Sequence, residues 1–375
     1  MLKVLHLISG GDDGGAKTHV LSLIKQLQKQ IDVTLVCFIK TEFYTDAINM
    51  GIDIKLFEQK QRYDLSVVKN LTTLINENNY DLVHCHGARA NFLATFFMHK
   101  IKVPSVTTVH SDFILDFQNS FYKQIFYKNL NVYSLKKFNY YIAVSDEFKR
   151  MLISRKFPED KIFTVYNGVD FDETLPTVNR LDFLKQYNLD HLDNKIILGI
   201  LARLHPVKGH KMLFESIAPL ISSNKDIHLL LAGDGDEKDS LIKHAEFLNI
   251  SDNIHFLGFV NKPLDVLNAI DINLLTSYSE SFPYVLLEGA LLKKPTVASS
   301  VGGIPMLIIN EETGLTFKAG CTSELTTKLN SVICSPEKQK KLGENLYKHA
   351  KENYSLENLA NTHIKIYKEI ISKGK

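Results

Sequence analysis

The chain has 375 residues, of which 45% are hydrophobic and 23% are charged, and its formal net charge is +2. This length exceeds what one compact core normally holds and is typical of two domains. The near-neutral charge argues against a general nucleic-acid-binding protein, so we expect no nucleic-acid partner.

The cysteines and the N-terminus favour a cytoplasmic protein. Cys37, Cys85, Cys321 and Cys334 stand far apart, so neither a zinc site nor a disulfide framework is predicted. The N-terminal apolar run is short and ends in a glycine cluster, which is typical of a buried strand rather than a signal peptide. No apolar stretch approaches the roughly 20 residues that span a bilayer.

Short apolar runs alternate with helical periods along the whole chain. The strand-like runs are Val4–Ile8, Val33–Phe38, Asp81–Cys85, Val106–Val109, Tyr141–Val144, Phe163–Val165, Ile196–Leu201, His228–Leu231, Ile254–Leu257, Ile272–Leu275 and Thr296–Ala298. Strands that alternate with helices predict βαβ units and parallel sheets covered on both faces.

The alternation pauses once and then restarts. Residues 171–194 are polar and contain Pro176, which is typical of a linker. The sequence therefore predicts an α/β protein of two Rossmann-like domains, residues 1–170 and 195–354, with parallel sheets facing a central cleft. The predicted helix at 355–375 is a candidate to pack back on the N-terminal domain. Ligands are expected just after the carboxyl ends of the strands.

The first loop is Gly10-Gly11-Asp12-Asp13-Gly14-Gly15. Glycines let a backbone approach a ligand, and the helix that follows favours anionic groups. Asp12 stands where a G-x-G-x-x-G fingerprint has its second glycine, which argues against a dinucleotide cofactor. A plain tight turn is the alternative.

The second domain opens with a strand-like run that ends near Ala202, followed by Arg203 and, five residues on, Lys208 at the start of the next helix. A diphosphate leaving group needs its charge neutralised, and without a metal that charge comes from Arg and Lys. Two solvated surface cations would give the same pattern.

The segment Glu280-Ser-Phe-Pro-Tyr-Val-Leu-Leu-Glu288 carries two carboxylates across a predicted loop-to-helix transition. Pro283 suits the first turn of a helix. Carboxylates in these places can accept hydrogen bonds from sugar hydroxyls, and the free N–H groups of residues 282–285 would point at phosphate. Acids near a helix start are also common without any ligand.

Taken together and in this order, these motifs resemble those of glycosyltransferase family 4, which are GT-B retaining glycosyltransferases. The resemblance covers nearly the whole chain. It rests on the acid pair, on Arg203…Lys208-Gly209, and on further matches at Ala143-Val-Ser145, Asn167-Gly168-Val169-Asp170, Gly233-Asp-Gly235, Gly258-Phe-Val260 and Gly302-Gly303-Ile-Pro305.

The resemblance implies roles for the acids and bases of the second domain. Glu288 would hold the ribose hydroxyls, and Glu280 would contact the donor sugar. Arg203 and Lys208 would clamp the diphosphate. The remaining implied donor-binding positions are Gly258, Val260, Phe282, Pro283, Tyr284 and Val285. Many family members have glycine where this chain has Pro283, which bears on the donor sugar rather than on the acids.

The resemblance also implies roles for the first domain. Gly14 and Gly15 would approach the phosphates or the acceptor. His110, which follows a strand-like run, would lie over the donor sugar and act in catalysis. A hydrogen-bonded loop histidine is the alternative for that position.

The expected activity is a metal-independent retaining transfer of a hexose-type sugar from a UDP-sugar to a glycan, a lipid-linked precursor or a surface polysaccharide, with no cofactor. Two Asp-x-Asp triplets, Asp170-Phe-Asp172 and Asp234-Gly-Asp236, lack the single-domain context of a metal site. A sugar-nucleotide epimerase of the same fold and a non-catalytic partner subunit are the alternatives.

Residues 121–141 hold four lysines and many aromatic side chains but no acids. A basic, aromatic helix suits an anionic membrane surface, which would put the enzyme at the inner face of the plasma membrane. A helix with its lysines in water is the alternative.

Overall fold

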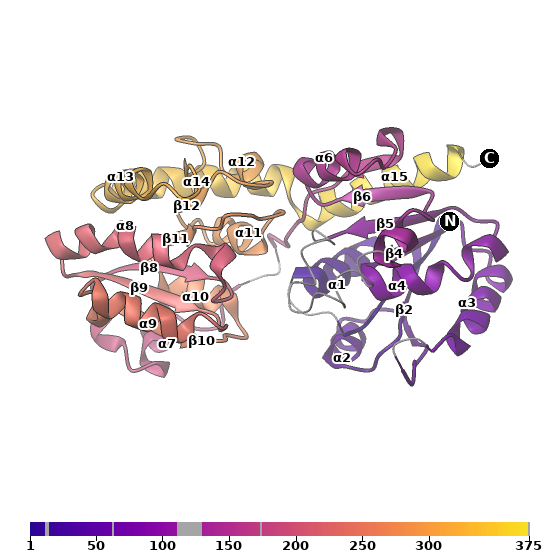
Figure 1. Cartoon of the computed structure of the whole chain (residues 1–375), viewed down its shortest axis with the longest axis horizontal. Helices are drawn as coiled ribbons and strands as arrows, with labels where there is room; N and C mark the ends of the chain where they lie inside the picture. Colours follow the sequence, from indigo (N-terminus) through magenta and orange to yellow (C-terminus); the bar gives the residue numbers. More distant parts are fainter. Residues whose placement is uncertain (12–14, 62–63, 111–129, 173–174, 374–375) are drawn as a thin grey trace. The chain divides into compact units, whose positions relative to one another are not determined.

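The computed structural model describes residues 1–11, 15–61, 64–110, 130–172 and 175–373. The chain forms two compact units, and the helices and strands of each are labelled in Figure 1. The first unit comprises Met1–Gly168 together with Leu356–Lys375, and the second comprises Val169–Ser355. The C-terminal helix therefore belongs to the first unit.

The first unit contains a seven-stranded sheet in the order β3-β2-β1-β4-β5-β6-β7, and every neighbouring pair is parallel. Its strands are β1 (Lys3–Ile8), β2 (Asp32–Cys37), β3 (Ile54–Leu56), β4 (Leu82–His86), β5 (Ser105–Val109), β6 (Tyr140–Ala143) and β7 (Ile162–Thr164). All residues of β4 and β5 are buried, as expected of strands covered on both faces.

Helices connect the strands of this sheet. They are α1 (Gly15–Leu27), α2 (Glu42–Asn49), α3 (Ser66–Glu77), α4 (Gly87–Ala94), α6 (Asp146–Ser154) and α15 (Leu356–Lys373), with short 3-10 turns η1 (Met98–Lys100) and η3 (Glu159–Lys161). Residues 130–135 are also helical. Thr41 and Ser145 cap α2 and α6 by accepting hydrogen bonds from the first-turn N–H groups of Phe43 and Phe148.

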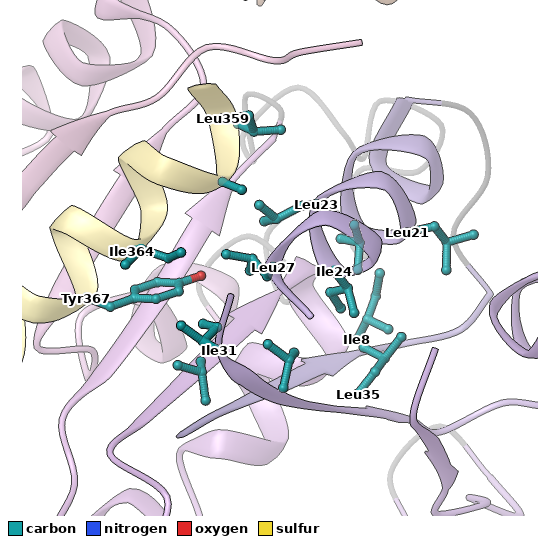
Figure 2. Close-up of a cluster of buried hydrophobic side chains, with 14 of the residues drawn as sticks. Ile8, Leu21, Leu23, Ile24, Leu27, Ile31, Leu35, Leu359, Ile364 and Tyr367 are labelled. Carbon is teal, nitrogen blue, oxygen red and sulfur yellow. The ribbon is translucent and has the colours of Figure 1, made fainter. Parts of the chain in front are cut away.

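The helix α15 is built into the core of the first unit. Figure 2 shows Leu359, Ile364 and Tyr367 of α15 beside Leu23 and Leu27 of α1. Each fully buried side chain of this size stabilises the fold by about 1.5–3 kcal/mol. The end of the chain is thus an integral layer of the first unit, in contact with the start of the chain.

The second unit contains a six-stranded parallel sheet in the order β10-β9-β8-β11-β12-β13. Its strands are β8 (Ile196–Leu201), β9 (Ile227–Ala232), β10 (Ile254–Gly258), β11 (Ile272–Leu275), β12 (Thr296–Ser299) and β13 (Leu315–Phe317). This strand order is that of a Rossmann fold.

The helices of the second unit alternate with these strands. They are α7 (Arg180–Gln186), α8 (His210–Ser223), α9 (Lys238–Phe247), α10 (Pro263–Ala269), α11 (Tyr284–Leu291), α12 (Ile304–Leu307), α13 (Thr322–Ile333) and α14 (Pro336–Asn353), with 3-10 turns η4 (Asp190–Leu192), η5 (Pro206–Lys208) and η6 (Ser251–Asn253).

Two local expectations differ from the structure. The segment 171–194, expected as a linker, contains α7 and η4, because Phe183, Leu184 and Leu192 pack into the core of the second unit. Lys208 does not begin a helix but ends η5, and α8 begins two residues later, after Gly209 in the left-handed conformation.

Across the described residues, no helix is both long and apolar enough to cross a membrane. The basic aromatic segment 121–141 lies partly outside the described residues, because its positions 121–129 are not described. In its remainder, Tyr133 is exposed and Lys137 Nζ lies 4.8 Å from the centre of the Tyr133 ring. The membrane contact expected of this segment stays a prediction.

Candidate active site

Two loops of the second unit carry opposite charges at the point where its strand order reverses. The strands β8 and β11 are neighbours, with β9 beyond β8 and β12 beyond β11. Lys208 lies in the loop that follows β8, and Glu280 lies in the loop that follows β11. Ligands of open parallel sheets bind beyond the carboxyl ends of the strands at such a reversal. Both charges therefore lie where a nucleotide is expected.

The Lys208 ammonium and the Glu280 carboxylate contact each other directly. Lys208 Nζ lies 2.5 Å from Glu280 Oε1, and the two side chains are only 17% and 10% exposed. Ser277 Oγ donates a second hydrogen bond to the same oxygen at 2.6 Å. Among the described residues, the other carboxylate oxygen, Oε2, has no hydrogen-bond partner. The pair therefore offers one cation and one acceptor oxygen to a polar ligand.

Backbone contacts hold these two loops together. Tyr278 N–H donates to the Val207 carbonyl at 2.7 Å, and Thr276 Oγ1 donates to the Lys208 carbonyl at 2.8 Å. Gly209 has a φ of 69°, and a Cβ atom there would collide with the Thr276 carbonyl oxygen. Glycine at 209 lets the lysine loop pack against the glutamate loop.

A third loop, which follows β12, packs on the backbone of Glu280. Gly302 has a φ of 60°, and a Cβ atom there would collide with the Glu280 carbonyl oxygen. The next residue, Gly303, donates its N–H to the Ser281 carbonyl at 2.7 Å. The placement of Glu280 thus depends on a residue without a side chain at 302.

Glu288 lies on α11, one helical turn after Tyr284. Burial raises the pKa of Glu288 from its ordinary 4.5 to about 7. The Tyr284 hydroxyl is buried and finds no hydrogen-bond partner among the residues that the structure describes, and burial together with the Glu288 charge raises the pKa of Tyr284 well above its ordinary value. Desolvation of a carboxyl group lowers the stability of the folded state, and such groups are concentrated at functional sites.

The residues between the two acids form the start of α11. Phe282 is buried, and its ring centre lies 4.9 Å from that of Tyr354. Pro283 is the N-cap, so Tyr284 and Val285 are the first two residues of the helix. Their N–H groups have no partner within the helix, whereas Pro283 has no N–H, and the phosphate contact expected of residues 282–285 stays a prediction.

The other predicted donor-binding positions of the second unit lie at strand ends. Arg203 follows β8 and is exposed. Gly258 ends β10 with a φ of 70°, Phe259 is 76% exposed, and Val260 is half-buried. Among the described residues, none of these makes a hydrogen bond or ion pair with the charged pair, and their role in donor binding stays a prediction.

The first unit holds the remaining predicted residues. Gly14 lies outside the described residues, and Gly15 is the exposed first residue of α1. His110 is half-buried and directly follows β5. His110 is not isolated, because its Nε2 lies 3.5 Å from Nδ1 of His86 at the end of β4.

His110 belongs to a cluster of imidazole rings in the first unit, which we call the histidine cluster. Neighbouring ring centres lie 4.2–6.3 Å apart. The members are His6 on β1, His19 on α1, His84 and His86 on β4, His110 after β5 and His363 on α15. Five segments of the sheet and helix layers therefore converge on one group of histidines.

These rings are held in the neutral state. Burial lowers the pKa of His6 and of His363 to about 3 and that of His19 to about 4. Burial lowers the pKa values of His84, His86 and His110 well below the ordinary value, and neighbouring histidines add to the effect. Each ring therefore offers one N–H donor and one lone pair near pH 7.

Three rings of the cluster have nitrogen atoms close enough together to suggest a metal ion. One nitrogen each of His6, His84 and His86 lies within 4.8 Å of the others. Both nitrogens of His84, however, are hydrogen-bonded at 2.7 Å, to the hydroxyls of Tyr367 and Thr108. A metal ion requires a free lone pair from each histidine, so the arrangement of His84 suits hydrogen bonding.

Sequence reasoning missed every member of the histidine cluster except His110. The His84-Cys85-His86 pattern was a usable signal, because alternate residues of a strand share one face. His6 lies opposite His84 in the parallel register, which depends on sheet order and cannot be read from spacing. His19 and His363 come from helices that are distant in sequence.

Comparison with known proteins agrees with this fold. Residues 13–173 match the model of the Glycosyltransferase Family 4, and residues 184–349 match that of the Glycosyl transferases group 1. The fold is that of Anabaena HepE in complex with UDP, with a TM-score of 0.81, 22% identity, and coverage of 98% of this chain and 100% of that one. The chain belongs to the family 4-like GT-B glycosyltransferases. The resemblance and the fold class expected from the motifs are thereby confirmed.

Two relatives of this glycosyltransferase match most of its length. One is the N-acetyl-alpha-D-glucosaminyl L-malate synthase of Bacillus anthracis, 25% identical over 84% of this chain and 81% of its own. The other is the UDP-Gal:alpha-D-GlcNAc-diphosphoundecaprenol alpha-1,3-galactosyltransferase of Escherichia coli, 26% identical over 76% of each chain. Sequence relatives and family models thus agree on glycosyl transfer.

Proposed function

We propose that this glycosyltransferase moves a hexose-type sugar, with retention, from a UDP-sugar to a hydroxyl of a glycan, a lipid-linked precursor or a surface polysaccharide. The observation that carries the proposal is the Lys208–Glu280 pair at the strand-order reversal of the second unit. A cation and a carboxylate at that point match a diphosphate and the hydroxyls of its sugar.

The relatives support this choice of substrates. The Escherichia coli relative is named for UDP-Gal and a diphosphoundecaprenol-linked acceptor, and HepE has also been solved in complex with UDP-glucose. The raised pKa of Glu288 favours a site that binds ribose hydroxyls, because a desolvated carboxylate gains most from such donors.

The proposed chemistry needs few groups. The acceptor oxygen bonds to the anomeric carbon on the face from which the diphosphate departs, the bond from that carbon to the diphosphate oxygen breaks, and the diphosphate takes the acceptor's proton. Lys208 and Arg203 neutralise the charge that grows on the diphosphate. Glu280 contacts the sugar, and His110 of the first unit donates or accepts a hydrogen bond at the sugar. We propose that no metal ion takes part and that the enzyme works in the cytoplasm.

Turnover assays test the proposal. UDP-glucose, UDP-galactose and UDP-N-acetylglucosamine are each incubated with the enzyme, with and without a polyprenyl diphosphate-linked sugar and with EDTA. Acceptor-dependent UDP release that persists in EDTA, with a product whose anomeric configuration matches the donor, is the expected result. Isomerisation of the donor without acceptor would instead identify an epimerase.

Substitutions test the two cations. Arg203→Ala and Lys208→Ala should each lower kcat, by about 10²–10³-fold if the group stabilises the departing diphosphate. Lys211→Ala is the matched control, because the Lys211 side chain is half exposed and lies on the next helix. Turnover at the wild-type rate in both test variants would exclude the assigned role.

A further inference from the structure

A continuous line of hydrogen bonds crosses the interior of the first unit and ends at His110. It begins at Thr108 Oγ1, which lies 2.7 Å from His84 Nε2. His84 Nδ1 lies 2.7 Å from the Tyr367 hydroxyl, which in turn lies 3.4 Å from His6 Nε2. The C-terminal helix thus supplies one link, the Tyr367 hydroxyl labelled in Figure 2.

The line continues from ring to ring. His6 Nδ1 lies 3.0 Å from His86 Nε2, and His86 Nδ1 lies 3.5 Å from His110 Nε2. We call this series the imidazole chain. Its members, in order, are Thr108, His84, Tyr367, His6, His86 and His110.

The protonation states along the imidazole chain are coupled. A neutral imidazole donates from one nitrogen and accepts at the other, and a tyrosine hydroxyl in the line does the same. If one ring reverses its donor and acceptor, each neighbour must reverse too or leave a buried group unpaired. The imidazole chain therefore has two arrangements of protons in which every hydrogen bond is made. In one, every ring is protonated at Nδ1, and in the other, every ring is protonated at Nε2.

The Thr108 hydroxyl makes one of these two arrangements more favourable than the other. Its side chain is buried, and within the described part of the chain its hydroxyl has His84 Nε2 as its single hydrogen-bonding partner. If Thr108 donates, His84 is protonated at Nδ1 and the same holds for His6, His86 and His110. In the reverse state the Thr108 proton would be buried without an acceptor, which is unfavourable.

We infer that Thr108 and Tyr367 are positioning residues that hold His110 as the Nδ1–H tautomer. His110 then accepts at Nε2 from His86 and presents its Nδ1–H as a donor. This inference rests on the proposed function for its purpose, since the sugar oxygen that would accept from His110 belongs to the proposed donor. The tautomer itself is a property of the free protein and is measurable without turnover.

The first experiment measures the tautomers of the wild-type protein. The full chain is labelled with 15N-histidine, and the ring nitrogens are observed by NMR at pH 7, with assignment by His110→Asn and His86→Asn. The expected spectrum shows Nδ1 protonated and Nε2 unprotonated for both rings. Protonation at Nε2, a rapidly exchanging mixture, or a stoichiometric metal ion retained by the purified protein would each overturn the inference.

Two variants interrupt the imidazole chain at positions far from His110. Thr108→Val removes the deciding hydroxyl, and Tyr367→Phe removes the link between His84 and His6. Both should abolish the single Nδ1–H state at His110 and give a mixture of tautomers. An unchanged His110 spectrum in both folded variants would refute the coupling.

Matched controls separate this effect from general loss of packing. Thr107→Val alters the neighbouring buried threonine, whose Oγ1 donates to Asn91 instead, at 2.8 Å. Tyr141→Phe removes a buried hydroxyl that donates to the carbonyls of Leu135 and Phe138. Both controls should keep the His110 tautomer, and a change in the controls equal to that in the test variants would assign the effect to packing.

Kinetics distinguish this inference from the proposed function. If both hold, Thr108→Val lowers kcat more than it raises KM for the donor. An inactive wild-type protein with the expected tautomers would refute the proposed function alone. An active enzyme with His110 protonated at Nε2 would refute the positioning role alone.

Discussion

Removing the charge of Glu288 should make the second unit more stable. Burial raises the pKa of Glu288 from 4.5 to about 7, so the native state holds a proton that the unfolded state has lost between these pH values. Stability therefore falls as pH rises through this window. At about 1.4 kcal/mol per pH unit, the full difference above pH 7 is about 3 kcal/mol. Glu288→Gln should recover that amount at pH 8 and none of it at pH 4.5.

Scanning calorimetry at pH 8 and pH 4.5 measures this difference. For a unit that spans Val169–Ser355, about 3 kcal/mol corresponds to a rise in Tm of roughly 6–12 °C. Glu312→Gln is the control, because Glu312 is an exposed acid of the same unit. A Tm gain of equal size at both pH values, or no gain at pH 8, would refute the burial argument.

The same substitution should weaken nucleotide binding, because a charge-assisted hydrogen bond contributes about 1.5–3 kcal/mol. Isothermal titration with UDP at pH 8 should show a Kd raised by about 10–100-fold. A variant that is stabilised and yet binds UDP as tightly as the wild type would place the ribose elsewhere and leave Glu288 without its assigned role.

Three further changes test the rest of the site. Ser277→Ala removes the second hydrogen bond to the Glu280 carboxylate, and the loss of roughly 1 kcal/mol should lower kcat/KM about fivefold in steady-state assays. Unaltered kinetics would contradict a role for this hydrogen bond in placing the carboxylate. Gly302→Ala combines a left-handed φ with a collision, and it should lower both Tm and kcat/KM, whereas Gly51→Ala, at a φ of 72° with no atom nearby, should cost only about 1–2 kcal/mol. In the histidine cluster, burial lowers the pKa of His6 and of His363 from 6.5 to about 3 and that of His19 to about 4. The first unit should therefore be most stable above pH 6.5 and lose stability as pH falls below that value, by up to about 1.4 kcal/mol per pH unit for each ring. Thermal melting of the first unit at pH 7 and pH 5.5 checks the last point, and an unchanged Tm would contradict it.

The order of the strands along the chain was predictable because each buried strand carries a run of apolar residues. Every strand-like run predicted from the sequence overlaps a strand of one of the two sheets. The two strands that were missed, β3 and β13, have three residues each and lie at sheet edges, where no apolar run is needed. The apolar residues of α7 escaped notice because they lie within a polar stretch after Pro176.

The site was predictable only where its chemistry lies close together in sequence. Glu280 and Glu288 share one motif, and Lys208 follows a recognisable strand end. Their expected roles came from the resemblance to glycosyltransferase family 4. The hydrogen bond from Ser277 and the ion pair between Lys208 and Glu280 depend on two loops meeting, which the strand order produces and the spacing does not reveal. The histidine cluster lies still further from sequence reasoning, because it joins β1, β4 and α15.

Each unit buries titratable groups whose ionisation makes its folded state less stable. The second unit buries the Glu288 carboxyl, whose ionisation destabilises it as pH rises, and the first unit buries neutral histidines, whose protonation destabilises it as pH falls. Burial of apolar side chains in either place would cost less free energy. The stability of the two units therefore changes in opposite directions with pH: that of the second unit falls as pH rises from 4.5 toward 7, and that of the first unit falls as pH drops below 6.5.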